Sequence, residues 1–440
     1  MSRSIPCICD AAAQIRDGRT TPIELVEHCL EQIRRHDDRL HAWVLVDHGG
    51  ARRAAEQLGR REPRGPLHGI PVGIKDIIDV AGMPTRAGSP LRENHLAAED
   101  APLVAALRRA GAVILGKTVT VEFACFDPSP TLNPWNPRHT PGGSSSGSAV
   151  AVATGMCFAA LGTQTGGSLV RPASYCGVAT CKPTFGALGV EGVVPVSYHL
   201  DHPGPMARCV DDLAVMLRCM RAEDGAGPLD AEEQAPPRLG LVEQFFMEGA
   251  DRAVREVAAA ALEKLRNCDA QIERAAFADG FEQVQPMHRR IMAVEAAAFH
   301  RRQFAAHRQS YGPLISQLLD EGLGIPAIDY AEALARQRRY SHRVAALLEG
   351  VDALIMPSTD TTAPPLSLGS TGSPKFQAPW SVAGLPVVSI PAGLAEDGLP
   401  VDVQLVGRRH EEAALLRIAR WCERRIAFDR TPPATRPGSP

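Results

Sequence analysis

Two glycine–serine clusters joined by an apolar segment constrain the folding of this chain more than any other feature. Residues 141–148 read PGGSSSGS, residues 162–172 read GTQTGGSLVRP, and residues 149–161 between them are almost entirely apolar. Glycine doublets beside serines mark backbone that adopts conformations forbidden to a side chain, or that approaches another group closely. A flexible linker shares this composition, but it would not pass into an apolar segment and then repeat the Gly-Gly-Ser turn. We therefore expect a buried element that holds both clusters at one site.

Other catalytic motifs fit the first cluster poorly. Residues 143–147 formally match GxSxG, which would make Ser145 the nucleophile. That motif requires a strand immediately before it, and residues 133–137 (NPWNP) predict none. A phosphate-binding loop would need a lysine directly after the glycines, and none follows. The histidines show no HExxH pattern, so a metal hydrolase has no support.

Lysine is rare in this chain, and its positions are informative. Only five of the 47 basic residues are lysines: Lys75, Lys117, Lys182, Lys264 and Lys375. Arginine therefore supplies the routine surface cations. What lysine can do and arginine cannot is to lose its proton under mild conditions. Three of the five lysines fall between residues 75 and 182, around the two clusters, which indicates a chemical role there.

Composition excludes several classes of function. The chain has 440 residues, 45% of them apolar, and a net charge of −3, so no basic footprint for nucleic acid or an anionic membrane is present. No apolar run approaches the ~20 residues of a membrane span, and no secretory signal is visible at the N-terminus. The eleven cysteines form no CxxC pair. We expect reduced thiols and a cytoplasmic location.

The pattern of apolar residues predicts alternating helices and strands. Thr21-Pro22-Ile23-Glu24 has the composition of a helix start. The expected elements are helices within residues 10–60, a short bridge at 41–46, a strand at 70–80, a helix at 100–110, and a strand at 112–115 followed by a turn at 116–117. Beyond a loop at 127–147, residues 211–350 have helical periodicity, residues 223–237 resemble a surface linker, strands return at 352–357, 385–394 and 401–406, and a helix covers 410–426. This order favours an α/β fold with one sheet.

Further motifs accompany the clusters: GPLHGIP at 65–71, KD at 75–76, GAVILGK at 111–117, CG through KPT at 176–184, DHPGP at 201–205, and GLP through PAG at 384–393. With these motifs, the sequence resembles the amidase signature family over most of its length. That family hydrolyses amide-type C–N bonds with a Ser–cis-Ser–Lys triad. The resemblance implies a mixed, twisted central sheet covered by helices on both faces.

The resemblance also implies one amidase signature domain over residues 1–430. Within it we expect a catalytic core at about 61–210, a variable helical insertion at 211–350, and returning strands with a last helix at 351–430. Residues 431–440 have the composition of a flexible tail. The insertion, together with the loop 127–140, should form much of the substrate entrance. Four apolar side chains could line that entrance or simply belong to the helix core: Phe245, Phe246, Met287 and Met292.

By position, Lys75 matches the family's base, Ser144 its cis-serine and Ser168 its nucleophile. A serine hydroxyl is a weak nucleophile that needs an adjacent base. Lys75 lies in an apolar stretch, where desolvation favours the neutral amine. The alternative for Lys75 is an ion pair with Asp76 or Asp79. Ser144 would relay the proton between the lysine and the nucleophile.

Backbone N–H groups of Thr165, Gly166, Gly167 and Ser168 resemble the family's oxyanion hole, and no metal or cofactor is required. Two departures bear on the substrate. The family's commonest motif has Asp where this chain has Gln164, and Arg where it has Val170. Gln164 and Arg171 are candidate substrate-binding residues. This form looks more like the small-substrate branch with malonamidases and biuret-pathway amidohydrolases than like the A subunit of the glutamyl-tRNA amidotransferase.

Two interpretations of Arg171 fit the sequence. Its guanidinium could bind a carboxylate or a polarised carbonyl of the substrate. Alternatively, it could bind backbone carbonyls or an acid beneath the loop and hold residues 166–168 in shape.

The predicted function is an amidohydrolase that cleaves the C–N bond of a small amide through an acyl-enzyme on Ser168. A carbamate (urethane) or urea-type hydrolase would use the same triad. Two other classes stay open: an amidotransferase A-type subunit that works with a partner, and a non-catalytic paralogue, which would have no chemical reason to keep Lys75 in an apolar strand. The expected partner is a small-molecule substrate, without nucleic acid or membrane, and the sequence leaves a homodimer open.

Overall fold

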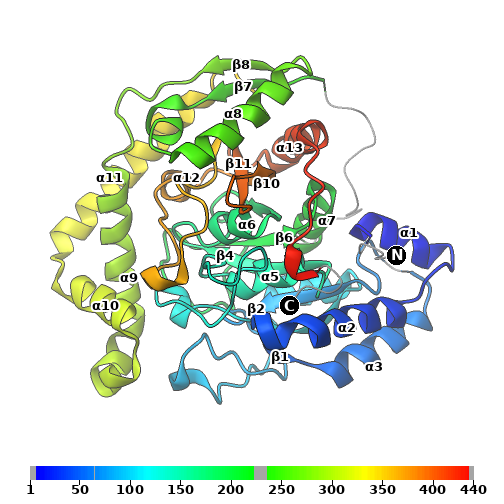
Figure 1. Ribbon diagram of the computed structural model, residues 1–440. Helices are drawn as coiled ribbons and strands as arrows, with labels where there is room; N and C mark the ends of the chain where they lie inside the picture. The colour runs from blue at the N-terminus through cyan, green and yellow to red at the C-terminus, as the bar shows by residue number, and fades with distance from the viewer. Residues whose placement is uncertain (1–5, 64, 222–234, 436–440) are drawn as a thin grey trace.

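The structure is a computed structural model that describes residues 6–63, 65–221 and 235–435. One mixed sheet forms its centre, with helices on both faces (Figure 1), which confirms the expected α/β fold. The strands are β1 (Trp43–Val46), β2 (Pro71–Lys75), β3 (Val113–Thr118), β4 (Ala159–Gln164), β5 (Ala179–Lys182), β6 (His202–Ala207), β7 (Arg238–Leu241), β8 (Gln271–Arg274), β9 (Ala353–Pro357), β10 (Val387–Leu394) and β11 (Pro400–Val406). Their order in the sheet is β1-β3-β2-β4-β6-β5-β10-β11-β9-β7-β8.

The α-helices are α1 (Ile8–Arg16), α2 (Pro22–Leu40), α3 (His48–Gly59), α4 (Pro102–Arg109), α5 (Ser146–Ala153), α6 (Val170–Cys176), α7 (Val210–Met220), α8 (Arg252–Arg266), α9 (Val284–His307), α10 (Pro313–Gly324), α11 (Ala327–Ala345), α12 (Ala378–Ala383) and α13 (Glu412–Ile426). Helices α9, α10 and α11 gather on one side of the molecule, at the left of Figure 1. The predicted start of α2 is confirmed: Thr21 and Glu24 form a capping box, and Pro22 opens the helix.

The apolar segment between the two clusters forms α5 and then the central strand β4. β4 pairs in parallel with β2, with Ile74 opposite Leu161, and antiparallel with β6. Because neighbouring parallel strands end at the same edge of a sheet, Lys75 at the end of β2 and Thr163 near the end of β4 lie together. The two glycine–serine clusters flank this edge, so the buried connection holds both at one site.

Four local predictions were wrong. The strand expected at 70–80 ends at Lys75, because residues 76–77 form a turn. Residues 116–117 are not a turn but part of β3; a side chain at Gly116 would place its Cβ 2.0 Å from the Leu45 carbonyl oxygen of β1, so this glycine permits a close strand approach. The expected bridge at 41–46 contains β1, which pairs with β3. The segment 211–350 is not wholly helical, because the short strands β7 and β8 extend the sheet beyond β9.

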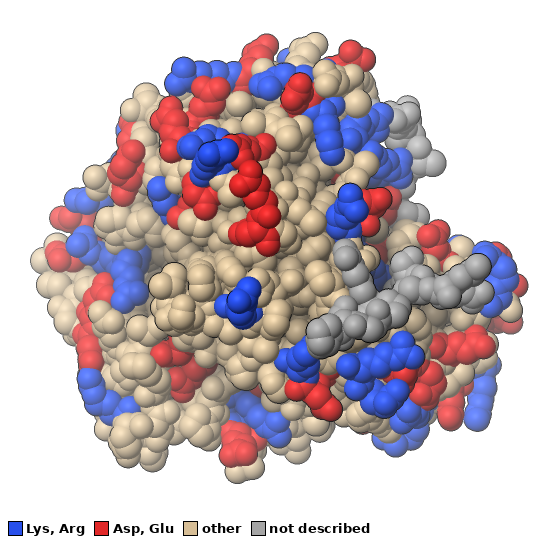
Figure 2. Space-filling view, in the orientation of Figure 1, with Lys and Arg blue, Asp and Glu red and all other residues tan. Residues whose placement is uncertain are grey.

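Two expected segments fall wholly or partly outside the described residues. The linker at 223–237 lies largely outside them. Of the tail, residues 433–435 form a short 3-10 helix, and 436–440 are not described. All eleven cysteines are free thiols, and none of the helices in the described part is long and apolar enough to cross a bilayer. Charged side chains of both signs are interspersed on the face shown in Figure 2, and its centre is largely uncharged.

Candidate active site

Lys75 is the last residue of β2, and its side chain is completely buried. Its Nζ donates hydrogen bonds to Ser144 Oγ at 2.6 Å and to Thr163 Oγ1 at 2.7 Å. Burial lowers the pKa of this amine from 10.5 to about 7, against the opposing influence of Asp201 and Cys125. Near neutral pH a substantial fraction of Lys75 is therefore the neutral amine, and that form can accept a proton.

The expected alternative, an ion pair of Lys75 with Asp76 or Asp79, is absent between these described residues. Asp76 instead pairs with Lys117, whose Nζ lies 3.0 Å from Asp76 Oδ1, and both side chains are fully buried. Lys117 also donates to the Pro84 carbonyl and to Thr85 Oγ1. The two lysines thus have separate surroundings: Lys117 has a carboxylate partner, and Lys75 has two hydroxyl groups.

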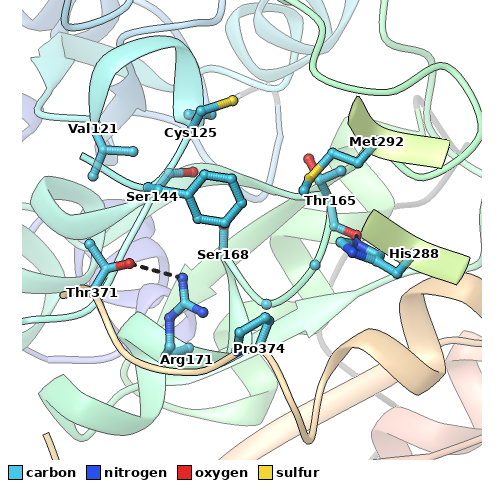
Figure 3. Close-up of a pocket in the computed structure, with 14 residues that line it drawn as sticks. Val121, Cys125, Ser144, Thr165, Ser168, Arg171, His288, Met292, Thr371 and Pro374 are labelled. Carbon is cyan, nitrogen blue, oxygen red and sulfur yellow. Dashed lines mark hydrogen bonds between the residues drawn. The ribbon is translucent and has the colours of Figure 1, made fainter. Parts of the chain in front are cut away.

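Ser144 and Ser168 line the same cavity (Figure 3). The peptide bond between Gly143 and Ser144 is cis, as the family resemblance implied. Ser168 lies within the second cluster, two residues before the start of α6, and is 8% exposed. Ser145 is fully buried, and its Oγ is bonded to the Thr163 backbone. No strand precedes it among residues 125–145, so the GxSxG interpretation is not supported.

The loop from Thr165 to Ser168 presents its backbone donors without partners. None of its four N–H groups donates to an acceptor among the described residues. The loop is held by its other groups. The Gly166 carbonyl accepts a hydrogen bond from Ser381 Oγ at 2.9 Å, and Thr165 Oγ1 donates to Asp201 Oδ1 at 2.6 Å. This arrangement leaves the N–H groups available to a developing negative charge.

Asp201, the first residue of the DHPGP motif at 201–205, is an acidic neighbour for which the sequence predicts no role. Besides Thr165, it accepts hydrogen bonds from the N–H groups of Val196 and Ser197. Burial raises the pKa of this carboxyl to about 6, while those hydrogen bonds and Lys75 oppose the rise. Asp201 therefore fixes one end of the loop and contributes negative potential at Lys75.

Gln164 does not line the cavity. Its Oε1 accepts hydrogen bonds from the N–H groups of Leu169 and Val170, both at 3.0 Å, and its Nε2 donates to Ser381 Oγ. The side chain is fully buried, so its polar atoms serve the protein and not a substrate in this geometry. Gln164 therefore stabilises the start of α6 by accepting hydrogen bonds from its first N–H groups, and we call this role a brace.

We expect Gln164→Leu to destabilise the protein by about 1–3 kcal/mol, because two buried N–H groups would lose their acceptor. Denaturant unfolding of the two proteins measures this change. An unchanged free energy of unfolding would show that Gln164 is not a brace.

Arg171 is 6% exposed and lines the cavity. Its Nη2 donates to the Gly143 carbonyl at 2.7 Å, just before the cis peptide bond, and to Thr371 Oγ1 at 3.4 Å (Figure 3). Within the described residues no carboxylate lies within 4.0 Å of its guanidinium. Arg171 therefore binds a backbone carbonyl, as one of the two interpretations expects, but that carbonyl belongs to Gly143 and not to residues 166–168. The charge beside the cavity has no carboxylate partner in direct contact among the described residues.

The cavity walls come from distant parts of the chain. The lining residues are Val121, Ala124, Cys125, Phe126, Ser144, Thr165, Gly166, Gly167, Ser168, Arg171, His288, Met292, Thr371 and Pro374. Helix α9 supplies His288 and Met292, so the segment 211–350 reaches the cavity as expected. The loop 127–140 supplies no lining residue; residues 121–126 take that place.

Of the four apolar candidates, only Met292 lines the cavity. Phe246 is fully buried, and it packs with Phe245 in an aromatic cluster away from the lining residues. Met287 belongs to the main core. Phe246 and Met287 are therefore core residues, and Phe245 is partly buried against the same cluster as Phe246.

His288, Thr371 and Pro374 are cavity residues that the sequence did not indicate. The ring of His288 packs against Gly166, and its Nε2 lies 3.2 Å from the Thr165 carbonyl oxygen. Burial lowers its pKa to about 4, so the ring is neutral and, as the Nε2–H tautomer, donates to that carbonyl. No local motif marks these three residues; only the packing of α9 and the 369–374 segment brings them here.

Comparison with known proteins agrees with this geometry. The model of the Amidase family matches residues 24–416. An amidase of Pseudomonas putida is 34% identical, over 93% of this chain and 94% of that protein. The A subunit of the glutamyl-tRNA(Gln) amidotransferase of Roseiflexus castenholzii is also 34% identical, over the same shares of the two chains. A crystal structure of an amidase matches with a TM-score of 0.87 and 34% identity, covering 96% of this chain and 100% of that one.

The chain belongs to the amidase family, as its motifs implied. It is an enzyme that hydrolyses amide C–N bonds.

Proposed function

We propose that this enzyme hydrolyses a small amide through an acyl-enzyme on Ser168. The observation that carries the proposal is the buried, hydrogen-bonded Lys75–Ser144 pair on the cavity that also holds Ser168. Neutral Lys75 takes the Ser144 proton as Ser144 takes that of Ser168. The Ser168 Oγ then attacks the substrate carbonyl carbon.

The tetrahedral intermediate places its negative charge on the former carbonyl oxygen. The unpartnered N–H groups of the 165–168 loop are the donors for that oxyanion. Collapse of the intermediate breaks the C–N bond, and the proton on Lys75 returns through Ser144 to the leaving amine. Water then attacks the acyl-enzyme with the same groups as base, releasing the carboxylic acid and restoring Ser168.

A fluorophosphonate tests this assignment directly. The reagent should form one adduct, and peptide mapping by mass spectrometry should place it on Ser168. An adduct on any other serine would contradict the assignment. For the substrate, turnover should be compared across small amides, aryl amides, ureas and carbamates, because a carbamate or urea would be cleaved by the same steps.

The volume of the cavity supports a small acyl group. The cavity volume is about 30 Å³. For comparison, a single water molecule needs ~10–15 Å³ by the same measure. A second candidate follows from the similarity to the A subunit of an amidotransferase. In that function a partner would receive ammonia released from glutamine. Glutaminase activity that appears only when a second protein co-purifies would favour it over the hydrolase.

A substitution of Arg171 tests whether the substrate is acidic or neutral. If its guanidinium binds a substrate carboxylate, Arg171→Ala should lower kcat/KM for acidic amides. The loss of transition-state stabilisation should be about 2–3 kcal/mol, the scale of a charge-assisted hydrogen bond. Neutral amides and carbamates should change little. Equal losses on both types would identify Arg171 as an anchor for Gly143 alone, and acidic amides would then lose their priority as substrates.

A further inference from the structure

Phe126 lies between the catalytic cavity and a second, adjoining groove. Its side chain and that of Thr371 line both spaces. The remaining groove residues are Arg289, Leu314, Gln317, Gly369, Ser370 and Gly372. The groove has a volume of about 190 Å³, against about 30 Å³ for the cavity. Space for a larger group therefore exists beside the cavity that holds Ser168, and Phe126 is the larger of the two residues that separate the two spaces.

The backbone that carries this ring has an unusual conformation. Phe126 has a φ of 49°, and Phe123 and Ala124 are also left-handed, with φ values of 45° and 59°. A bulky residue seldom adopts this region, and such conformations persist where the surrounding structure imposes them, commonly at functional sites. The position would suit glycine better. The chain nevertheless places a large ring there.

Both ends of the 122–127 segment are fastened. Glu122 accepts hydrogen bonds from Ser89 Oγ at 2.8 Å and from the Gly312 N–H at 2.7 Å. Asp127 accepts from the N–H groups of Leu314 and Ile315 in the first turn of α10. The helix that supplies Leu314 and Gln317 to the groove is thus tied to the segment that supplies Phe126.

Arg289, a groove residue, also contacts the Phe126 ring. The guanidinium of Arg289 lies 5.1 Å from the centre of the Phe126 ring, and it pairs with Glu321 at 2.8 Å. Because Glu321 already pairs with the arginine charge, the groove offers mainly uncharged hydrogen-bonding groups, the Gln317 carboxamide and the Ser370 hydroxyl.

We propose that Phe126 is the specificity-determining wall that limits the length of the acyl group accepted at Ser168. This inference rests on the proposed acyl-enzyme. In the wild-type enzyme the acyl chain ends at the ring. Without the ring, the cavity and the groove become one channel, and a longer acyl chain, including one with an uncharged polar end, can enter.

The test uses n-alkyl fluorophosphonates from ethyl to octyl, whose alkyl group takes the place of the acyl chain. In the reaction Ser168 Oγ forms a bond to phosphorus, the P–F bond breaks, and fluoride and the serine proton leave. For the wild type, we expect the second-order inactivation rate to fall about tenfold or more between ethyl and octyl. Phe126→Ala and Phe126→Gly should remove most of that fall, when the rates of each variant are expressed relative to its own rate with the ethyl compound.

Phe299→Ala is the matched control, because Phe299 is 39% exposed on α9 and lines neither space. It should keep the wild-type dependence on chain length. Phe126→Leu, a smaller change that preserves an apolar side chain, should fall between wild type and Phe126→Ala. The inference is overturned if folded Phe126 variants, with cooperative melting, keep the wild-type dependence. If the ethyl compound does not label wild-type Ser168, the proposed acyl-enzyme itself fails.

Discussion

Ser168→Ala should remove turnover almost completely, by about 10⁴-fold or more in kcat, while the protein stays folded. Without the hydroxyl no acyl-enzyme forms, and the remaining donors of the loop only polarise the substrate. The measurement is steady-state hydrolysis of the best small amide found in the substrate screen, with circular dichroism to confirm folding. Fluorophosphonate labelling should disappear with the activity.

Ser145→Ala is the matched control, because it changes the serine that the GxSxG pattern would nominate. Within the described part of the chain, its Oγ forms hydrogen bonds with the Thr163 backbone alone. We therefore expect some loss of stability but continued labelling at Ser168. Activity above a few per cent in Ser168→Ala, or loss of labelling in folded Ser145→Ala, would contradict the assignment of the nucleophile.

Lys75→Arg should lower kcat/KM by about 10²–10⁴-fold, the range of a lost general base. Arginine keeps the positive charge but does not give up its proton. The pH dependence of kcat/KM in the wild-type enzyme also tests whether Lys75 is the base. Because burial lowers the pKa of Lys75 to about 7, the amine is protonated and inactive below that pH and neutral above it. The kcat/KM value should therefore rise with pH through about 7 and then level off.

Lys182 is a close control for this effect. It is also fully buried, and burial lowers its pKa to about 7. Its Nζ, however, donates to the Leu385 and Pro183 carbonyls and does not line the cavity. Lys182→Met should lower the free energy of unfolding. It should keep the acid limb of the pH profile, which is the fall in kcat/KM below about pH 7. If the limb disappears in folded Lys182→Met, or persists in Lys75→Arg, then Lys75 is not the titrating base.

The sequence predicted the parts of the site that local patterns encode. The scarcity of lysine drew attention to Lys75, and its apolar neighbours predicted the burial that lowers its pKa. The repeated Gly-Gly-Ser turn, with an apolar connection, predicted that Ser144 and Ser168 lie together, because the buried connection becomes α5 and the central strand β4.

The parts that depend on tertiary packing could not be predicted in this way. His288 and Met292 reach the cavity only because α9 packs beside the 165–168 loop, and nothing in their own spacing marks them. Gln164 is a candidate substrate-binding residue in the sequence because it stands where the family's commonest motif has Asp, but at the end of β4 its side chain contacts the start of α6. The strands β7 and β8 were missed because each is short and lies between long helical segments.

The burial of Lys75 makes hydrolysis depend on complete folding. In an unfolded or newly synthesised chain this lysine is hydrated, its pKa is near the ordinary 10.5, and it is a cation that cannot activate a serine. The cavity walls also include Thr371 and Pro374, far along the chain from Lys75. A growing chain therefore carries its nucleophile and base long before it can use them. Loss of activity during heating or denaturant titration should report the opening of this core, so the reaction is itself a probe of folding.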